Sequence, residues 1–471
     1  MAILTVLKKG SKEEIFFEPP KNLSELLKDN ELHVPHPCGG KGACKKCKVA
    51  VNGKEELSCR YVLTCDATVT LGDDERIHSV LGTSESGDAS GELCLCLDIG
   101  STTLALALVS IDEKKTVKAI TAGNPQRAFG ADVMSRIEYC MKNGVDKLNS
   151  ALVEKIGQMI RELLSDFGIE KIEKMFVAGN TTMLHTFFGV DCSSMGASPY
   201  TPKFIESRRE SGEKLGLISV GEVISLPGIS AFVGADIVAG MYYVGMPADP
   251  AKYNILIDLG TNAEIVLYNS KTALCTAAAA GPCFEGANIS CGTSAVKGAV
   301  CEFKPDKSFR TIGDAEAVGI CATGLIDMVA ELVKDETIDE TGYMDEDYVL
   351  SSTVSLTQGD VREFQLAKSA VKSALLCLIK RAGISFKSVE RMFIAGGFSS
   401  QMNVSNAAKV GLIPGELTDR FSPINNGSLL GTIKYAVEQG STEPFTSVAE
   451  YADISSDAYF SEQFFENMMF E

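Results

Sequence analysis

Apolar and polar residues alternate in short runs over the first 81 residues of the chain. The runs AILTVL (2–7), EIFFE (14–18), KVAVNG (48–53) and TVTLG (68–72) have the length and composition of β-strands, and LSELLKDN (23–30) has apolar residues at helical spacing. This pattern predicts a small α+β domain over residues 1–81. Residues 82–93, GTSESGDASGEL, lack apolar periodicity and are rich in Gly, Ser and acidic side chains, which predicts a flexible linker.

From residue 94 onward, β-like runs alternate with helical segments, and a weak repeat appears. LCLDIGSTTLALALVS (95–110) is similar to NILIDLGTNAEIVLYNS (254–270), and IEKMFVAGNTTM (172–183) to VERMFIAGGFSSQM (389–402). We therefore expect an α/β fold in which two copies of one unit, residues 94–250 and 251–440, face each other as two lobes.

An acidic and aromatic tail follows over residues 441–471. Its Phe460, Phe464 and Met468 lie on one face of a predicted helix. This face either docks on the core of its own chain or contacts a partner or a second copy of the chain.

Composition and charge narrow the classes of function. Asp and Glu total 62 against 44 Lys and Arg, a net charge of −18, so we expect no binding of nucleic acid. No stretch reaches the ~18 apolar residues of a membrane span, and the first residues lack the apolar core of a secretory signal. We therefore expect a cytoplasmic protein. Its fifteen cysteines indicate thiols or metal ligands rather than a disulfide framework.

Three cysteines lie close together in HPCGGKGACKKC (36–47). Cys38, Cys44 and Cys47 have C-x5-C-x2-C spacing, and Cys65 in YVLTC provides a fourth thiolate. Four thiolates are the ligands of a 2Fe-2S cluster, whereas structural zinc usually takes two close cysteine pairs. We predict a 2Fe-2S cluster on these four residues, with Cys59 as the alternative to Cys65. Cysteines that share one face of an apolar strand, such as 94 and 96, are expected in the core.

Two similar turns suggest a phosphate site. Each follows a β-like run that ends in an aspartate, Asp98 or Asp258, and each contains a glycine and hydroxyl or amide side chains. Backbone and hydroxyl donors of such a turn can bind phosphate oxygens while the carboxylate holds hydrated Mg²⁺. The candidate ligands are Gly100, Ser101, Thr102 and Thr103 in the first turn and Gly260, Thr261, Asn262 and Glu264 in the second. Glycines 396 and 397, after a third run, allow close approach of an adenine ring.

These motifs resemble the superfamily of sugar and acetate kinases, heat-shock chaperones and actin. The resemblance implies two ribonuclease-H-like lobes that close on ATP. Asp98 and Asp258 then organise Mg²⁺ and water, the two turns clamp the phosphates, and Gly396, Gly397 and Phe398 contact the adenosine. VAGNTT (177–182) matches the motif that connects the lobes, and either Asn180 or Asp236 positions the attacking water. His185, in the same segment, is expected to be a packed helix residue.

The cysteine segment resembles the ferredoxins with C-x5-C-x2-C spacing, which implies a β-grasp fold for residues 1–81. The whole chain resembles one family, the ATP-dependent reductive activators of corrinoid proteins, through PCGGKGACKKCKV, LDIGSTTL, VAGNTTMLH, FVGADIVAG, IDLGTNAEIVL, GPCFEGANISCG, GICATGLIDMVAEL and FIAGGFSS. This resemblance implies that a 2Fe-2S cluster reduces cob(II)amide to cob(I)amide in a methyltransferase system while ATP is hydrolysed. The implied partners are a corrinoid protein and an upstream low-potential donor, and a second copy of the chain is a further candidate partner.

Two alternatives remain open at this point. One is an ATP-dependent activator of another low-potential enzyme, such as a radical dehydratase. The other is a redox-sensing regulator whose nucleotide state controls a partner without delivering electrons.

Overall fold

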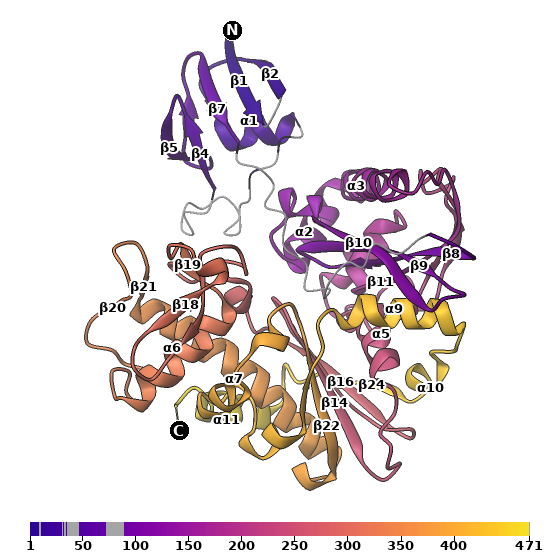
Figure 1. Ribbon diagram of the computed structural model, residues 1–471, viewed down its shortest axis with the longest axis vertical. Helices are drawn as coiled ribbons and strands as arrows, with labels where there is room; N and C mark the ends of the chain where they lie inside the picture. Colours follow the sequence, from indigo (N-terminus) through magenta and orange to yellow (C-terminus); the bar gives the residue numbers. More distant parts are fainter. Residues whose placement is uncertain (9–10, 31, 33, 35–46, 72–88, 471) are drawn as a thin grey trace.

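The computed structural model describes the chain except for residues 9–10, 31, 33, 35–46, 72–88 and 471 (Figure 1). The N-terminal domain is a five-stranded sheet with helix α1 packed against it, in the strand order β2-β1-β7-β4-β5. Strand β1 pairs in parallel with β7 and antiparallel with β2. Its elements are β1 (Ala2–Lys8), β2 (Ser11–Phe17), β3 (Lys21–Asn22), α1 (Leu23–Asp29), β4 (Lys48–Val51), β5 (Lys54–Leu57), β6 (Val62–Leu63) and β7 (Ala67–Thr70).

The core of this domain follows from the alternation along its strands. Leu4 and Val6 of β1 point inward and pack with Leu23 and Leu27 of α1, and all four side chains are buried. The predicted ferredoxin-like β-grasp domain is confirmed. Most of the predicted linker, residues 82–88, lies outside the described residues, so its flexibility stays a prediction.

The first lobe is a six-stranded mixed sheet in the order β10-β9-β8-β11-β13-β12. Strand β8 is buried on both faces: Leu95 and Leu97 pack toward helix α3, and Cys94 and Cys96 toward helix α9. The two cysteines are thus core residues, as expected. The elements are β8 (Leu93–Ile99), β9 (Thr103–Ser110), β10 (Lys115–Gly123), α2 (Val133–Asn143), α3 (Asp146–Ser165), β11 (Ile172–Gly179), α4 (Thr181–Phe187), β12 (Arg209–Ser211), β13 (Val220–Ser225) and α5 (Ala235–Val244).

The second lobe repeats this plan in the order β23-β22-β14-β15-β16-β24. As in the first lobe, an antiparallel hairpin lies beside a parallel strand, here β22. The predicted duplication of one α/β unit is confirmed. The elements are β14 (Tyr253–Leu259), β15 (Ala263–Tyr268), β16 (Ala273–Ala278), β17 (Ala299–Phe303), β18 (Phe309–Thr311), β19 (Gly319–Ile320), α6 (Ala322–Lys334), β20 (Tyr348–Val349), β21 (Ser355–Leu356), α7 (Gln358–Arg381), β22 (Val389–Ala395), α8 (Val404–Lys409), β23 (Phe421–Pro423), α9 (Gly427–Glu438), α10 (Glu443–Thr446), β24 (Ala449–Tyr451) and α11 (Ala458–Glu466).

Helix α5 follows the first sheet in sequence and packs on both sheets, on β11 of the first and on Leu256 of β14 in the second. Helix α9 follows the second sheet in sequence but packs on β8 of the first. The two helices cross in close contact between the lobes (Figure 1). A Cβ on Gly431 of α9 would lie 1.8 Å from the carbonyl oxygen of Ala239 in α5. This crossing therefore requires a residue without a side chain.

The C-terminal helix α11 docks on its own chain, one of the two alternatives predicted for it. Phe460 and Phe464 pack on the core of the second lobe, and Phe470 is buried in it. The ammonium of Lys368 in α7 donates hydrogen bonds to the carbonyls of Asn467 and Met469, at 2.7 and 2.6 Å.

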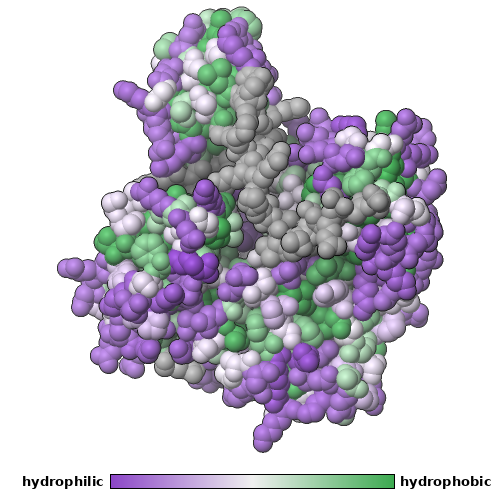
Figure 2. All heavy atoms as spheres, in the orientation of Figure 1, coloured by the Kyte–Doolittle hydropathy of each residue, from purple (hydrophilic) through white to green (hydrophobic). Residues whose placement is uncertain are grey.

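Hydrophilic side chains cover much of the face of the molecule that Figure 2 shows. No helix among the described residues is long and apolar enough to span a membrane.

Candidate functional site

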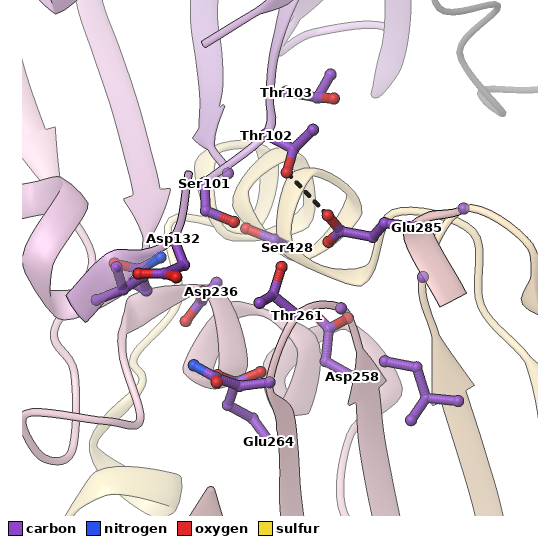
Figure 3. Close-up of a pocket in the computed structure, with 18 of the residues that line it drawn as sticks. Ser101, Thr102, Thr103, Asp132, Asp236, Asp258, Thr261, Glu264, Glu285 and Ser428 are labelled. Carbon is purple, nitrogen blue, oxygen red and sulfur yellow. Dashed lines mark hydrogen bonds between the residues drawn. The ribbon is translucent and has the colours of Figure 1, made fainter. Parts of the chain in front are cut away.

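A cavity of about 530 Å³ lies between the two lobes. The turns after β8 and β14 and the first residues of α5 and α9 form its walls (Figure 3). Almost all of the residues that sequence analysis assigned to a nucleotide line this one cavity. They are Asp98, Gly100, Ser101, Thr102, Thr103, Asn180, Asp236, Asp258, Gly260, Thr261, Asn262, Glu264, Gly396 and Gly397.

The first turn is held by hydrogen bonds from behind. The amide of Gly100 donates to the carbonyl of Thr103 at 3.0 Å, and a Cβ on Gly100 would lie 2.7 Å from that oxygen. The buried side chain of Arg136 donates to the carbonyl of Ser101 at 2.6 Å, and Asn124 to that of Gly100 at 2.8 Å. Burial lowers the pKa of Arg136 to about 10, so the guanidinium stays charged at neutral pH. The turn therefore has one main-chain conformation.

Asp98 and Asp258 face different crossing helices. On each strand, the alternation of side chains between the two faces sets the direction of the aspartate. Asp98 lies on the same face of β8 as Cys94 and Cys96 and so points toward α9, where Ser428 and Asn426 donate to its two oxygens at 2.7 and 2.8 Å. Burial raises the pKa of Asp98, and these two hydrogen bonds oppose the rise. Sequence analysis did not find Asn426 and Ser428, because nothing in the sequence places them beside a residue more than 300 positions away.

Three further carboxyl groups share the opposite side of the cavity. Burial raises the pKa of Asp236 to about 7, and the charge of Asp258 adds to the rise. The pKa of Asp258 is also raised to about 7, by burial and then by the charges of Asp98 and Glu285. Burial and the charges of Asp236 and Asp258 raise that of Glu264 well above its usual value. Among the described residues that line the cavity there is no lysine or arginine, so this cluster favours a cation.

The segment 177–182, which was expected to connect the lobes, ends β11 and begins α4, and both elements pack in the core of the first lobe. Asn180 and His185 belong to this part of the chain. Asn180 lines the cavity, but its amide oxygen caps α4 by accepting from the amide of Met183 at 2.9 Å. His185 is buried; its Nδ1 lies 2.7 Å from the carbonyl oxygen of Thr181, and its Nε2 accepts from the amide of Lys203 at 3.0 Å. The prediction that His185 is a packed helix residue is confirmed.

Phe398 was expected to contact the adenosine, and it does not line the cavity. Its ring stacks on Phe284, with centroids 5.7 Å apart and planes at 25°, and packs on the core of the second lobe. The aromatic side chain is directed into the core because the chain turns at Gly396, where φ is +121°. Only the two glycines of this motif border the cavity. Other lining residues that sequence analysis missed are Asp132, Glu285, Asn425, Asn426 and Ser428.

The cysteines of the N-terminal domain fit the predicted cluster only in part. Cys38 and Cys44 lie outside the described residues. The Cys47 and Cys59 sulfurs are 3.2 Å apart, too far for a disulfide and close enough to face one site. Cys65 is exposed between β6 and β7. The structure thus places Cys59 beside Cys47 and Cys65 at the surface, and the choice between them as the fourth ligand stays a prediction.

Main-chain contacts explain this arrangement. The amide of Ser58 donates to the carbonyl of Cys47 at 2.9 Å, and Asn22 donates to the carbonyl of Cys59 at 3.1 Å. The turn that carries Cys59 is thus bonded both to Cys47 and to the start of α1. Cys65 follows a strand in which Leu63 points into the core, and this turn directs its own side chain outward.

Known proteins similar to this chain share its whole organisation. Residues 252–471 match the model described as the C-terminal domain of RACo, the ASKHA domain, residues 93–249 match the RACo middle region, and residues 6–70 match a 2Fe-2S iron-sulfur cluster binding domain. The corrinoid activation enzyme RamQ of Eubacterium limosum is 25% identical over 582 residues, which cover 97% of this chain and 98% of that protein.

Two further matches agree with these models. A [Co(II) methylated amine-specific corrinoid protein] reductase of Methanosarcina barkeri is 26% identical over 396 residues, 76% of this chain and 72% of that one. A solved structure of a reductive activator for corrinoid, iron-sulfur protein superposes with a TM-score of 0.73 at 24% identity and covers 99% of this chain and 98% of that one. The chain therefore belongs to the RACo family, in which a 2Fe-2S domain precedes the RACo middle region and a C-terminal ASKHA domain.

Proposed function

We propose that this protein reductively activates a corrinoid protein: it delivers one low-potential electron that returns cob(II)amide to cob(I)amide in a methyltransferase system, with ATP hydrolysed. The observation that carries this proposal is the presence, in one chain, of facing cysteine thiols in a ferredoxin fold and a two-lobed cavity with two phosphate-type turns. The names of both relatives, an activation enzyme and a reductase of corrinoid proteins, support it.

The N-terminal domain is the electron carrier in this proposal. Cys38, Cys44, Cys47 and Cys65 hold the 2Fe-2S cluster, with Cys59 as the alternative to Cys65. The cluster supplies one electron at a time when bound. The sulfur atoms of Cys47 and Cys59 lie 3.2 Å apart, which supports Cys59 as the alternative ligand. An upstream low-potential protein reduces it, and the reaction takes place in the cytoplasm, where thiols stay reduced.

The cavity between the lobes binds ATP with Mg²⁺. The main chain of the two turns binds the phosphates, and the glycines at 396 and 397 border the adenosine. Asp98 and Asp258 hold the hydrated Mg²⁺. The raised pKa values of Asp258 and Asp236, about 7, support this assignment, because a divalent cation removes the repulsion that contributes to them.

ATP is needed because the electron moves to an acceptor of lower potential. For one electron, each ~60 mV of unfavourable potential costs about 1.4 kcal/mol. Closure of the lobes on ATP favours a complex with the corrinoid protein in which its cobalt is easier to reduce. The turns that bind phosphate come from different lobes, so the same ligand that is hydrolysed also draws the lobes together.

An anaerobic spectroscopic experiment tests this function. The reduced protein is mixed with Mg-ATP and candidate cob(II)amide proteins, and the cob(I)amide absorption band is followed. We expect the band to appear only with ATP, and to be lost in Cys47→Ala and Asp258→Asn variants. If no corrinoid protein responds, but a radical dehydratase is activated, the chain is an electron donor to another class of enzyme. A band that forms at the same rate without ATP refutes the role of the nucleotide.

A further inference from the structure

Glu285 is presented to the cavity by a rigid segment of the second lobe. It ends the short 3₁₀ helix Pro282–Glu285 in the motif GPCFEGANISCG, whose role the phosphate turns do not explain. The preceding residue, Phe284, is buried and stacks on Phe398. The following residue, Gly286, has a φ of +74°, and a Cβ added to it would lie only 2.5 Å from the main chain of Thr293. Only glycine fits at 286, and this tight turn fixes the direction of the Glu285 side chain.

The carboxylate of Glu285 lies between the two phosphate turns. Its Oε2 accepts a hydrogen bond from the hydroxyl of Thr102 in the first lobe at 3.1 Å (Figure 3). Its Oε1 lies 3.4 Å from the point that a Cβ on Gly260, in the second turn, would occupy. No donor within the described part of the chain bonds to Oε1. One oxygen is thus anchored across the cleft, and the other remains available to a ligand in the cavity.

The other candidates for orienting the attacking water have other roles, and Asp98 is assigned to the hydrated Mg²⁺. Both oxygens of Asp98 accept from α9, and the amide oxygen of Asn180 caps α4. Asp236 accepts from the amide of Ile237 at 2.9 Å and belongs to the carboxyl cluster with Asp258 and Glu264 that favours a cation. Glu285 combines a fixed position beside both turns with an oxygen that lacks a donor.

We propose that Glu285 orients the water that attacks the γ-phosphate of ATP and that Thr102 holds it in place when the lobes are closed. The water oxygen forms a bond to the γ-phosphorus while the bond to the β,γ-bridging oxygen breaks, and ADP leaves with that electron pair. Both protons of the water end on the released phosphate as H₂PO₄⁻, so atoms and charge balance. This inference rests on the proposed ATPase function and names a catalytic residue for it.

The proposal also explains why hydrolysis depends on lobe closure. Thr102 belongs to the first lobe and Glu285 to the second, so the hydrogen bond between them exists only when the cleft is closed. An open cleft leaves the carboxylate unanchored. ATP is then spared until both turns have engaged its phosphates.

Purified, cluster-loaded protein tests the inference through ATP hydrolysis and ATP affinity, measured separately. We expect Glu285→Ala to lower kcat about 100-fold with the Kd for Mg-ATP within threefold, and Glu285→Gln, which keeps an oxygen acceptor, to recover at least tenfold of that loss. Thr102→Val should lower kcat about tenfold, Thr102→Ser should restore it, and Thr102→Val should have no further effect in the Glu285→Ala background. Glu363→Ala, which removes a glutamate of α7 outside the cavity, is the matched control.

Each outcome separates this inference from the proposed function. If Glu285→Ala hydrolyses ATP at the wild-type rate, the role of Glu285 is overturned. A loss of ATP affinity as large as the loss of kcat overturns it as well. Additive effects of the two substitutions overturn the anchoring role of Thr102. If the wild-type protein itself neither binds nor hydrolyses ATP, the proposed function fails instead. The far-UV circular dichroism spectrum and the Tm should be the same in all variants and report that the lobes are folded.

Discussion

The crossing of helices α5 and α9 at Gly431 makes a quantitative prediction. In Gly431→Ala the new Cβ would lie 1.8 Å from the carbonyl oxygen of Ala239 and 2.3 Å from its carbonyl carbon. Ordinary van der Waals contact begins at 3.4 Å, so the helices must separate by about 1.6 Å. Both partners of the clash are main-chain atoms of a helix, so no side-chain rotation relieves it.

The stability change is the difference between two effects. In an unconstrained helix alanine is more favourable than glycine by about 0.5–1 kcal/mol, whereas overpacking a buried contact costs about 1–3 kcal/mol and more when main chain must move. We expect the free energy of unfolding to fall by about 1–2 kcal/mol. We also expect ATP hydrolysis to fall at least tenfold, because α9 begins beside the cavity and its Ser428 donates to Asp98 at 2.7 Å.

Urea denaturation and steady-state ATP hydrolysis measure the two effects. The matched control is Gly359→Ala in the first turn of α7, where the glycine is exposed and the nearest atom to a Cβ is the Thr357 hydroxyl at 3.6 Å. The control should be as stable as the wild type or slightly more stable and fully active. If Gly431→Ala matches the control in both measurements, the two helices do not hold the lobes in register and the reasoning is refuted.

Four further predictions concern the cluster, the carboxyl groups, the first turn and the tail. Cys65→Ala should lose the visible absorption of the 2Fe-2S cluster and Cys59→Ala should retain it; the reverse result would make Cys59 the fourth ligand. The pKa of Asp258 in the folded protein, about 7, is raised, so this carboxyl lowers stability progressively as pH rises through that value. Asp258→Asn should therefore raise the Tm of the nucleotide-free protein at pH 8 and leave it unchanged at pH 4, and an equal shift at both would contradict the assignment. Arg136→Lys keeps the charge but cannot make the separate hydrogen bonds to Gly130 and Ser101, so the Kd for Mg-ATP should rise about tenfold by calorimetry. Lys368→Met should lower the free energy of unfolding by about 2–3 kcal/mol and expose the C-terminal helix to limited proteolysis, since two charge-assisted hydrogen bonds are lost; unchanged proteolysis would show that apolar packing alone holds the tail.

Local patterns in the sequence determined the elements and the broad plan of this protein. Three features can be read directly, because each depends on residues that are close together in the sequence. They are the alternation along the strands, the two turns with aspartate and glycine, and the similarity of 95–110 to 254–270. They correctly predicted the β-grasp domain, the two similar lobes and the gathering of the two turns at one cavity. The position of Asp98 and Asp258 at the ends of equivalent strands follows from the repeat alone.

Contacts between distant parts of the chain were decided only by the tertiary structure. The approach of Cys59 to Cys47 depends on main-chain bonds of its turn to Cys47 and α1, and the inward packing of Phe398 depends on Phe284. The bond of Glu285 to a threonine 183 positions away has no signature in either segment. Sequence patterns report which face of an element is apolar, but they do not report which other element covers that face. In this protein the placement of the two crossing helices between the lobes decides it, and with it the composition of the site.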